Sequence, residues 1–223
     1  MFSNLVFGLY DVLIKGKLEK DIDNSYLSSL SDFAKENHKE LFLISGLHED
    51  VNQDVLHQNN LDNFFKQENI FCVNGDYLKS LNEIDQQLRE ENYSKNKYYV
   101  DDYFKIYLFN QKPELFSPQN TLYVGHDIWT DAFYLRRFTK INFVLLNQTI
   151  SNNGKPFERA IKYSHIIDPS FEVFKNYLSV PHVFDYSFLD SYINTTLQKN
   201  VIGLLDLSNL DLSKLVKKKN PEL

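Results

Sequence analysis

The chain has few of the residues that build disulfide frameworks, cysteine zinc sites or glycine-rich ligand loops. Of its 223 residues one is cysteine, seven are glycine and six are proline. A single cysteine cannot form an internal disulfide, and it cannot supply the several thiolates of a structural zinc site. We therefore expect a cytoplasmic protein of a reducing compartment, with Cys72 as a buried thiol in the apolar stretch Ile70–Val73.

An excess of basic residues and long hydrophobic runs are also missing. The formal net charge is −6 and the pI about 5.5, whereas proteins that bind nucleic acids or anionic membranes are normally basic. No run reaches the roughly 18 apolar residues of a membrane span, and the amino terminus lacks the pattern of a signal peptide. We expect neither a nucleic acid nor a membrane as a partner.

The chain does contain enough apolar material for the core of one large domain, because 43% of its residues are hydrophobic. Short apolar runs alternate with amphipathic segments of helical spacing. Near-continuous apolar runs are typical of strands covered on both faces, and the alternation predicts an α/β fold with a central parallel sheet. The expected strands are Leu5–Leu9, Leu41–Ser45, Asn69–Val73, Thr121–Gly125 and Ile141–Leu146, and the expected helices are Ser25–Asn37, Val51–Phe65 and Asp131–Phe138.

The sequence divides into one main domain and two additions. Residues 1–178 are expected to form the α/β domain, with residues 76–100 as an exposed helical insertion. Within that insertion, helical spacing from Tyr77 onward predicts one amphipathic helix and a turn around Asn92–Asn96. The helix is either simply solvated or serves as a lid or partner surface. Residues 179–223 are too apolar for a free tail, so we expect a small helical appendage that packs on the domain or on a partner.

Ligands of doubly wound α/β proteins lie at the carboxyl ends of the strands. The first strand is followed by Gly8-Leu9-Tyr10-Asp11, the second ends in Ser45-Gly46, and the third ends in Gly125-His126-Asp127 with Asp131 shortly after. Lys105 precedes the third strand.

In their order and spacing these segments resemble the motifs of the haloacid dehalogenase-like superfamily of phosphohydrolases. Those motifs are a strand ending in Asp-x-Asp, a strand ending in Ser or Thr, a lysine, and an acidic Gly-Asp-x-x-x-Asp. The resemblance covers about residues 1–178. It implies a three-layer Rossmannoid sandwich, and the short segments between the motifs indicate that no large cap domain is present.

The resemblance also implies a chemistry. The first aspartate attacks phosphorus, the second acts as general acid and base, the hydroxyl and the lysine hold the phosphoryl group, and the acidic motif binds Mg²⁺. Ser45, Gly46 and Lys105 match the phosphate-binding positions. The nucleophile position, however, is Gly8 and the acid/base position is Tyr10.

Losing a covalent nucleophile typically costs many orders of magnitude in rate. We therefore expect a catalytically inactive pseudophosphatase with an interaction, regulatory or phospho-ligand-binding role and no required cofactor. Its partner would be another protein or a phosphorylated small molecule, such as a sensed nucleotide or sugar phosphate, and its oligomeric state is open. The alternative is a divergent Mg²⁺-dependent phosphatase that hydrolyses a small phosphomonoester, with Asp11 as a displaced nucleophile rather than a turn-capping residue.

The acidic motif leaves two interpretations open. His126, Asp127 and Asp131 could together hold a metal ion, since imidazole and carboxylate are common ligands. Otherwise His126 hydrogen-bonds a neighbouring loop and Asp131 caps the following helix.

Two further features of the strand ends have alternative explanations. Ser45 either contributes to an anion site or caps the next helix. In an inactive protein, Tyr10 and Trp129 would together fill the old pocket with aromatic bulk.

Overall fold

The computed structural model describes residues 2–10, 12–15, 19–20, 24–146, 166–167, 170–179 and 185–199. Asp11 and the residues from 200 onward lie outside this part of the chain, so the expectations for both stay predictions.

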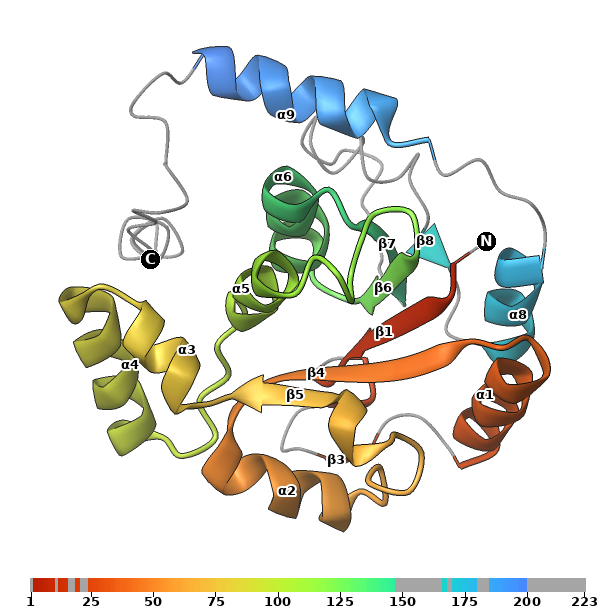
Figure 1. Cartoon of the computed structure of the whole chain (residues 1–223), viewed down its shortest axis with the longest axis horizontal. Coiled ribbons are helices and arrows are strands. Elements are labelled where there is room, and N and C mark those ends of the chain that lie inside the picture. The colour runs from red at the N-terminus through yellow and green to blue at the C-terminus, as the bar shows by residue number, and fades with distance from the viewer. Residues whose placement is uncertain are drawn as a thin grey trace.

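A parallel sheet forms the centre of the molecule (Figure 1). Among the described residues it has six strands in the order β5-β4-β1-β6-β7-β8, and every pairing is parallel. This is the doubly wound order, in which successive strands are added first on one side of β1 (β4, β5) and then on the other (β6, β7, β8). The predicted α/β fold with a central parallel sheet is therefore confirmed. The strands are β1 (Asn4–Gly8), β4 (Glu40–His48), β5 (Ile70–Val73), β6 (Thr121–Gly125), β7 (Asn142–Leu146) and β8 (Ile166–Ile167).

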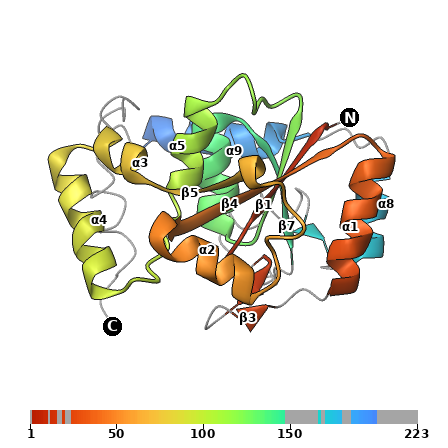
Figure 2. The ribbon, with the colours of Figure 1, turned by 60° about the horizontal axis from the view of Figure 1, so that its bottom comes forward.

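Helices cover both faces of the sheet, which gives three layers (Figures 1 and 2). On one face lie α1 (Asn24–Glu36), α2 (Glu49–Gln58) and α8 (Phe171–Ser179), and on the other lie α5 (Phe104–Gln111), α6 (Leu135–Thr139) and α9 (Ser187–Lys199). After β1 the described chain forms only the short antiparallel hairpin of β2 (Ile14–Lys15) and β3 (Glu19–Lys20) before α1. In the described residues, no separate folded unit interrupts this region.

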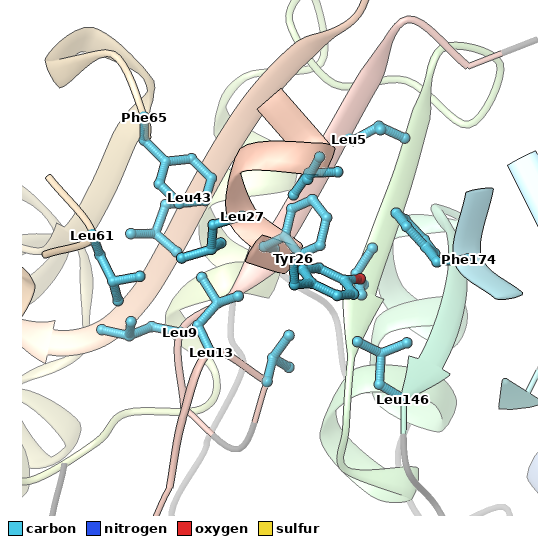
Figure 3. Close-up of a cluster of buried hydrophobic side chains, with 14 of the residues drawn as sticks. Leu5, Leu9, Leu13, Tyr26, Leu27, Leu43, Leu61, Phe65, Leu146 and Phe174 are labelled. Atoms are coloured by element: carbon cyan, nitrogen blue, oxygen red, sulfur yellow. The ribbon is translucent and has the colours of Figure 1, made fainter. Parts of the chain in front are cut away.

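Alternating side chains of β1 separate the two hydrophobic clusters, because successive strand residues point to opposite faces. Leu5 and Phe7 belong to the cluster under α1, α2 and α8, whereas Val6 belongs to the cluster under α5, α6 and α9. In the first cluster the rings of Phe7 and Phe174 pack edge to face, with their centres 5.9 Å apart. Figure 3 shows how Leu9 and Leu13, just after β1, extend the same cluster.

The described part of the carboxyl-terminal segment packs on the second face. The Tyr186 hydroxyl donates to the carbonyl oxygen of Phe143 at 2.6 Å and accepts from its N–H at 3.0 Å. Arg136 on α6 holds both carboxylate oxygens of Asp190 at 3.0 and 2.9 Å. Leu189 and Ile193 of α9 are fully buried in the same cluster.

The polar insertion differs from the single helix that its sequence predicts. It forms two helices, α3 (Gly75–Ser80) and α4 (Glu83–Lys95), and α4 continues through the region expected to be a turn. Ile84, an apolar residue of α4, is 71% exposed. Asp85 and Arg89 are buried instead. The helical spacing from Tyr77 onward therefore identified the helical segment but not the buried face of α4.

A buried ion cluster explains this orientation of α4. Arg89 lies 3.5 Å from Asp85 and donates through Nε to Asp101 at 3.0 Å. The Tyr77 hydroxyl of α3 donates to the same Asp101 oxygen at 2.9 Å. Both helices are thus fixed to the loop that precedes α5, beyond the carboxyl end of β5 (Figure 1). None of the helices described here is long and apolar enough to cross a membrane.

Candidate functional site

A pocket of about 160 Å³ opens where β1, β4 and β6 end, at the point where the strand order reverses. Such crevices are where doubly wound proteins bind their ligands. The lining residues are Gly8, Leu9, Tyr10, Ile44, Gly46, Val100, Asp101, Asp102, Lys105, Tyr123, His126, Asp127 and Asp131. Most of the residues singled out in the sequence are therefore brought together here, with Ser45 and Trp129 absent from the lining.

An ion pair between Lys105 and Asp131 closes the floor of this pocket. Lys105 lies in the first turn of α5, and Asp131 lies in η2 (Ile128–Tyr134), a π-helix that follows β6. Their side chains are only 8% and 6% exposed and are in direct contact. The ammonium also lies 3.4 Å from Thr130 Oγ1 and 5.6 Å from the ring centre of Tyr123. A lysine that would ordinarily be solvated is thus buried with its charge neutralised.

Four donors surround the Asp131 carboxylate. Oδ1 accepts from the Lys105 ammonium and, at 3.1 Å, from the Tyr123 hydroxyl. Oδ2 accepts from the backbone N–H groups of His126 at 2.7 Å and Asp127 at 2.9 Å. Gly125 makes room for this arrangement, because a Cβ at its position would lie 2.5 Å from the Asp131 Cβ. Each oxygen of this carboxylate thus accepts two hydrogen bonds from the protein itself.

The pKa values of the pair follow from these contacts. Burial by itself raises the pKa of Asp131, but the Lys105 ammonium and the two N–H groups outweigh it and hold that pKa below its ordinary value. Burial by itself lowers the pKa of Lys105, and the Asp131 carboxylate outweighs it, so the Lys105 pKa is raised. Burial and the Asp131 charge both raise the pKa of the Tyr123 phenol. Both ionic groups are therefore charged at neutral pH.

Asp127, rather than Asp131, caps the helix. Its Oδ1 accepts from the N–H groups of Trp129 at 2.9 Å and Thr130 at 2.6 Å. The expectation that Asp131 caps this helix is wrong, because the π-helix turns its side chain inward to Lys105. His126 Nδ1 lies 3.2 Å from the carbonyl oxygen of Leu146, the last residue of β7, so its neighbour is a strand end rather than the expected loop.

The residues at this site do not fit Mg²⁺. The four donors on Asp131 leave its oxygens no room for a cation, and one Asp127 oxygen caps η2. Within the described ranges, no group of three or more His, Cys, Asp or Glu side chains is arranged to hold a metal ion. The structure thus does not assemble His126, Asp127 and Asp131 into a ligand set.

A tyrosine hydroxyl fills the space beside the position that matches the nucleophile. A Cβ placed on Gly8 would lie 2.6 Å from the Tyr123 hydroxyl oxygen. Tyr10 lines the pocket as expected, but Trp129 is 41% exposed and lies elsewhere. The aromatic that fills the pocket floor is Tyr123.

Sequence reasoning missed Tyr123, although a signal for it exists. It is the one aromatic residue of Thr121–Gly125, a strand buried at every position. A buried phenol needs a hydrogen-bond partner, and alternation places Tyr123 on the same face as Gly125, where the polar residues gather. A tyrosine two residues before a strand-end glycine thus points into the ligand crevice.

The second predicted motif does not end its strand at Ser45-Gly46. Strand β4 continues to His48, and His48 rather than Ser45 caps α2, with its side chain accepting from the Asp50 N–H at 3.4 Å. Ser45 is buried and its Oγ accepts from the Leu47 N–H at 3.2 Å. The Gly46 carbonyl is taken by the Asp101 N–H at 2.8 Å. Whether this segment binds phosphate stays a prediction, and both the Ser45 Oγ and the Gly46 carbonyl already accept a hydrogen bond from the protein.

The pocket lining is acidic. Four aspartates and one lysine are among its described residues, and that lysine is neutralised by Asp131. The charge of Asp101 is compensated by its ion pair with Arg89. The described lining thus holds more acidic than basic side chains, an excess that disfavours a phosphate dianion.

A scan against models of protein families finds no match, and a search of curated proteins finds no significant match in sequence. Among solved structures, the chain is similar to the core domain of a candidate phosphoglycolate phosphatase from Streptococcus pneumoniae TIGR4, determined by NMR. The TM-score is 0.43 and the identity 10%, with 81% of this chain and 98% of that chain covered. At this distance the likeness carries no statement about function, which has to come from the pocket itself.

Replacing Gly46 with alanine should destabilise the fold by about 1–3 kcal/mol, the usual range for overpacking a closed site. The new Cβ would lie 2.7 Å from the Asp101 carbonyl oxygen and 2.9 Å from its N, and backbone atoms cannot turn aside. Urea unfolding measures the loss. Gly75→Ala is the matched control, because nothing lies within 4 Å of its added Cβ. Equal stability of the two variants would contradict the tight packing at Gly46.

Proposed function

We propose that this chain is a pseudophosphatase, a phosphatase-like α/β protein that acts by binding a partner rather than by turnover. The observation that carries the proposal is the pair of Gly8 and Tyr123. The position that matches the nucleophile has no side chain, and a tyrosine hydroxyl takes up the space that a side chain there would need.

The other groups of an aspartyl-phosphate mechanism are also missing or engaged. The acid/base position holds a phenol, Tyr10, in place of a carboxylate. Lys105 pairs with Asp131 instead of facing an incoming phosphoryl group. Both oxygens of Asp131 already accept two hydrogen bonds each, so it is not available to a metal ion. These features together support an inactive site.

The charge of the pocket favours an interaction or regulatory role over the sensing of a phosphorylated ligand. The described lining holds four aspartates and one lysine, and this lysine, which would otherwise attract phosphate, is paired with Asp131. Within the described residues no separate folded unit follows β1 to cover the strand ends, which favours contact with a large partner. The partner that suits this surface is a protein.

The proposal is tested with p-nitrophenyl phosphate and Mg²⁺, Mn²⁺ or Co²⁺ in turn. We expect rates at the level of the protein-free background with every metal, because the position that matches the nucleophile is Gly8. An Asp11→Asn variant serves as the comparison. Metal-dependent turnover that disappears in Asp11→Asn would contradict the proposal and establish a divergent phosphatase instead.

A further inference from the structure

The contacts of Asp131 have the form of an occupied anion site. A buried ammonium, a phenol hydroxyl and two backbone N–H groups all point at one carboxylate. The ammonium and the hydroxyl come from α5 and β6, and the two N–H groups come from the loop between β6 and η2. Three separate elements therefore build a cradle of donors, and Asp131 supplies the anion.

We propose that Asp131 is a built-in occupant that keeps a latent carboxylate-binding site closed. Without its carboxylate, the cradle of Lys105, Tyr123 and the N–H groups of His126 and Asp127 would take a small monoanion of the formate class. This inference deepens the proposed function. It rests on that function in one respect, namely that the site of the wild-type protein is closed to phosphate.

The pocket provides the route by which such an anion enters. All five residues of the cradle and its occupant line the same 160 Å³ pocket. Asp131 is nevertheless 4% exposed, so an anion bound there would be desolvated and held by charge-assisted hydrogen bonds. Alanine keeps the Cβ and favours helix, so Asp131→Ala removes the carboxylate with little effect on the backbone.

The experiment follows the thermal unfolding of Asp131→Ala in sodium formate and in sodium chloride at matched ionic strength. The variant should melt below the wild type in chloride. Formate should raise its melting temperature in a saturable way, and at ten times the Kd it should raise the ratio of folded to unfolded protein about elevenfold. Acetate should act more weakly, because its methyl group would meet the methyl group of the introduced alanine. The wild type should respond to neither formate nor inorganic phosphate.

Two control variants locate the effect. Asp127→Ala removes a neighbouring carboxylate of the same pocket that is not paired with Lys105. Formate should therefore not raise the melting temperature of this variant. Lys105→Met/Asp131→Ala lacks the ammonium, so its melting temperature should be the same in formate as in chloride. An equal response of Asp131→Ala to formate and chloride would overturn the inference, and so would saturable stabilisation of the wild type by phosphate.

Asp131→Asn covers the case in which Asp131→Ala does not fold. The amide matches the carboxylate in shape, but its NH₂ meets donors in either orientation. We expect a lower melting temperature than the wild type, and equal stability would overturn the inference. Turnover of p-nitrophenyl phosphate by the wild type would refute the proposed function alone, whereas a missing formate effect in an inert protein would refute only the latent site.

Discussion

Replacing Lys105 with methionine is expected to lower the free energy of unfolding by about 3–5 kcal/mol, because it leaves the Asp131 carboxylate buried without a counter-ion. Methionine retains most of the aliphatic length of the lysine, so the loss of packing is small. The side chains of the pair are 8% and 6% exposed, so solvent does not screen the lost interaction. Urea unfolding followed by circular dichroism measures the change.

The double variant Lys105→Met/Asp131→Asn should lose far less than the sum of its two single variants. The asparagine oxygen can still accept from the N–H groups of His126 and Asp127, while its NH₂ can donate to the Tyr123 oxygen. Removing both charges together leaves no unpaired ion in the interior. Additive losses would show that the two residues are not coupled, contrary to the geometry.

The pH dependence of this pair follows from the directions of its pKa shifts. The pKa of Asp131 is lowered from 3.8, so its stabilisation is complete above that pH and is lost as the pH falls through the folded-state value. The pKa of Lys105 is raised from 10.5, so its stabilisation is complete below that pH and is lost as the pH rises further. The difference in stability between wild type and Lys105→Met/Asp131→Asn should therefore stay constant from about pH 5 to 9 and shrink outside that range.

The strands could be predicted from the sequence because a parallel strand buried on both faces consists of a nearly continuous run of apolar residues. The runs at Leu5–Leu9 and Thr121–Gly125 match β1 and β6 to within a residue. Strand β4 extends past its predicted end because His48 pairs with Val73 of β5. That contact joins residues far apart in sequence, and no local pattern announces it.

The residues of the pocket could be predicted more readily than their partners. The order of the motifs correctly gathers Lys105 and Asp131 at the strand ends, but it assigns one to phosphate and the other to metal. Their mutual pairing depends on the π-helical turn of η2, which the sequence does not show. In the same way, Asp85 and Arg89 have the spacing of an exposed helical ion pair, and only Asp101 from a later loop explains their burial.

Restoring an aspartate at position 8 should destabilise the protein rather than revive a phosphatase. The new Cβ would lie 2.6 Å from the Tyr123 oxygen and 3.5 Å from its Cζ, so the tyrosine would have to leave its hydrogen bond to Asp131. We expect Gly8→Ala to lose about 1–3 kcal/mol through overpacking. Gly8→Asp should lose more, because it also buries a second carboxylate beside Asp131. Urea unfolding gives both losses, and p-nitrophenyl phosphate with Mg²⁺ tests for turnover.

Tyr123→Phe separates the steric part of this effect from the electrostatic part. Alone it should cost about 1 kcal/mol, the usual value of one hydrogen bond. Tyr123→Phe/Gly8→Ala should lose less stability than the two single variants together. Without the hydroxyl, the nearest atom of the ring to the new methyl group is Cζ at 3.5 Å, which is an ordinary contact. Gly8→Asp/Tyr123→Phe should fold better than Gly8→Asp and still lack turnover, because Tyr10 offers no carboxylate for acid–base catalysis. If Gly8→Asp is as stable as the wild type, Tyr123 does not hold the space of the missing nucleophile, and the main support for an inactive site is lost.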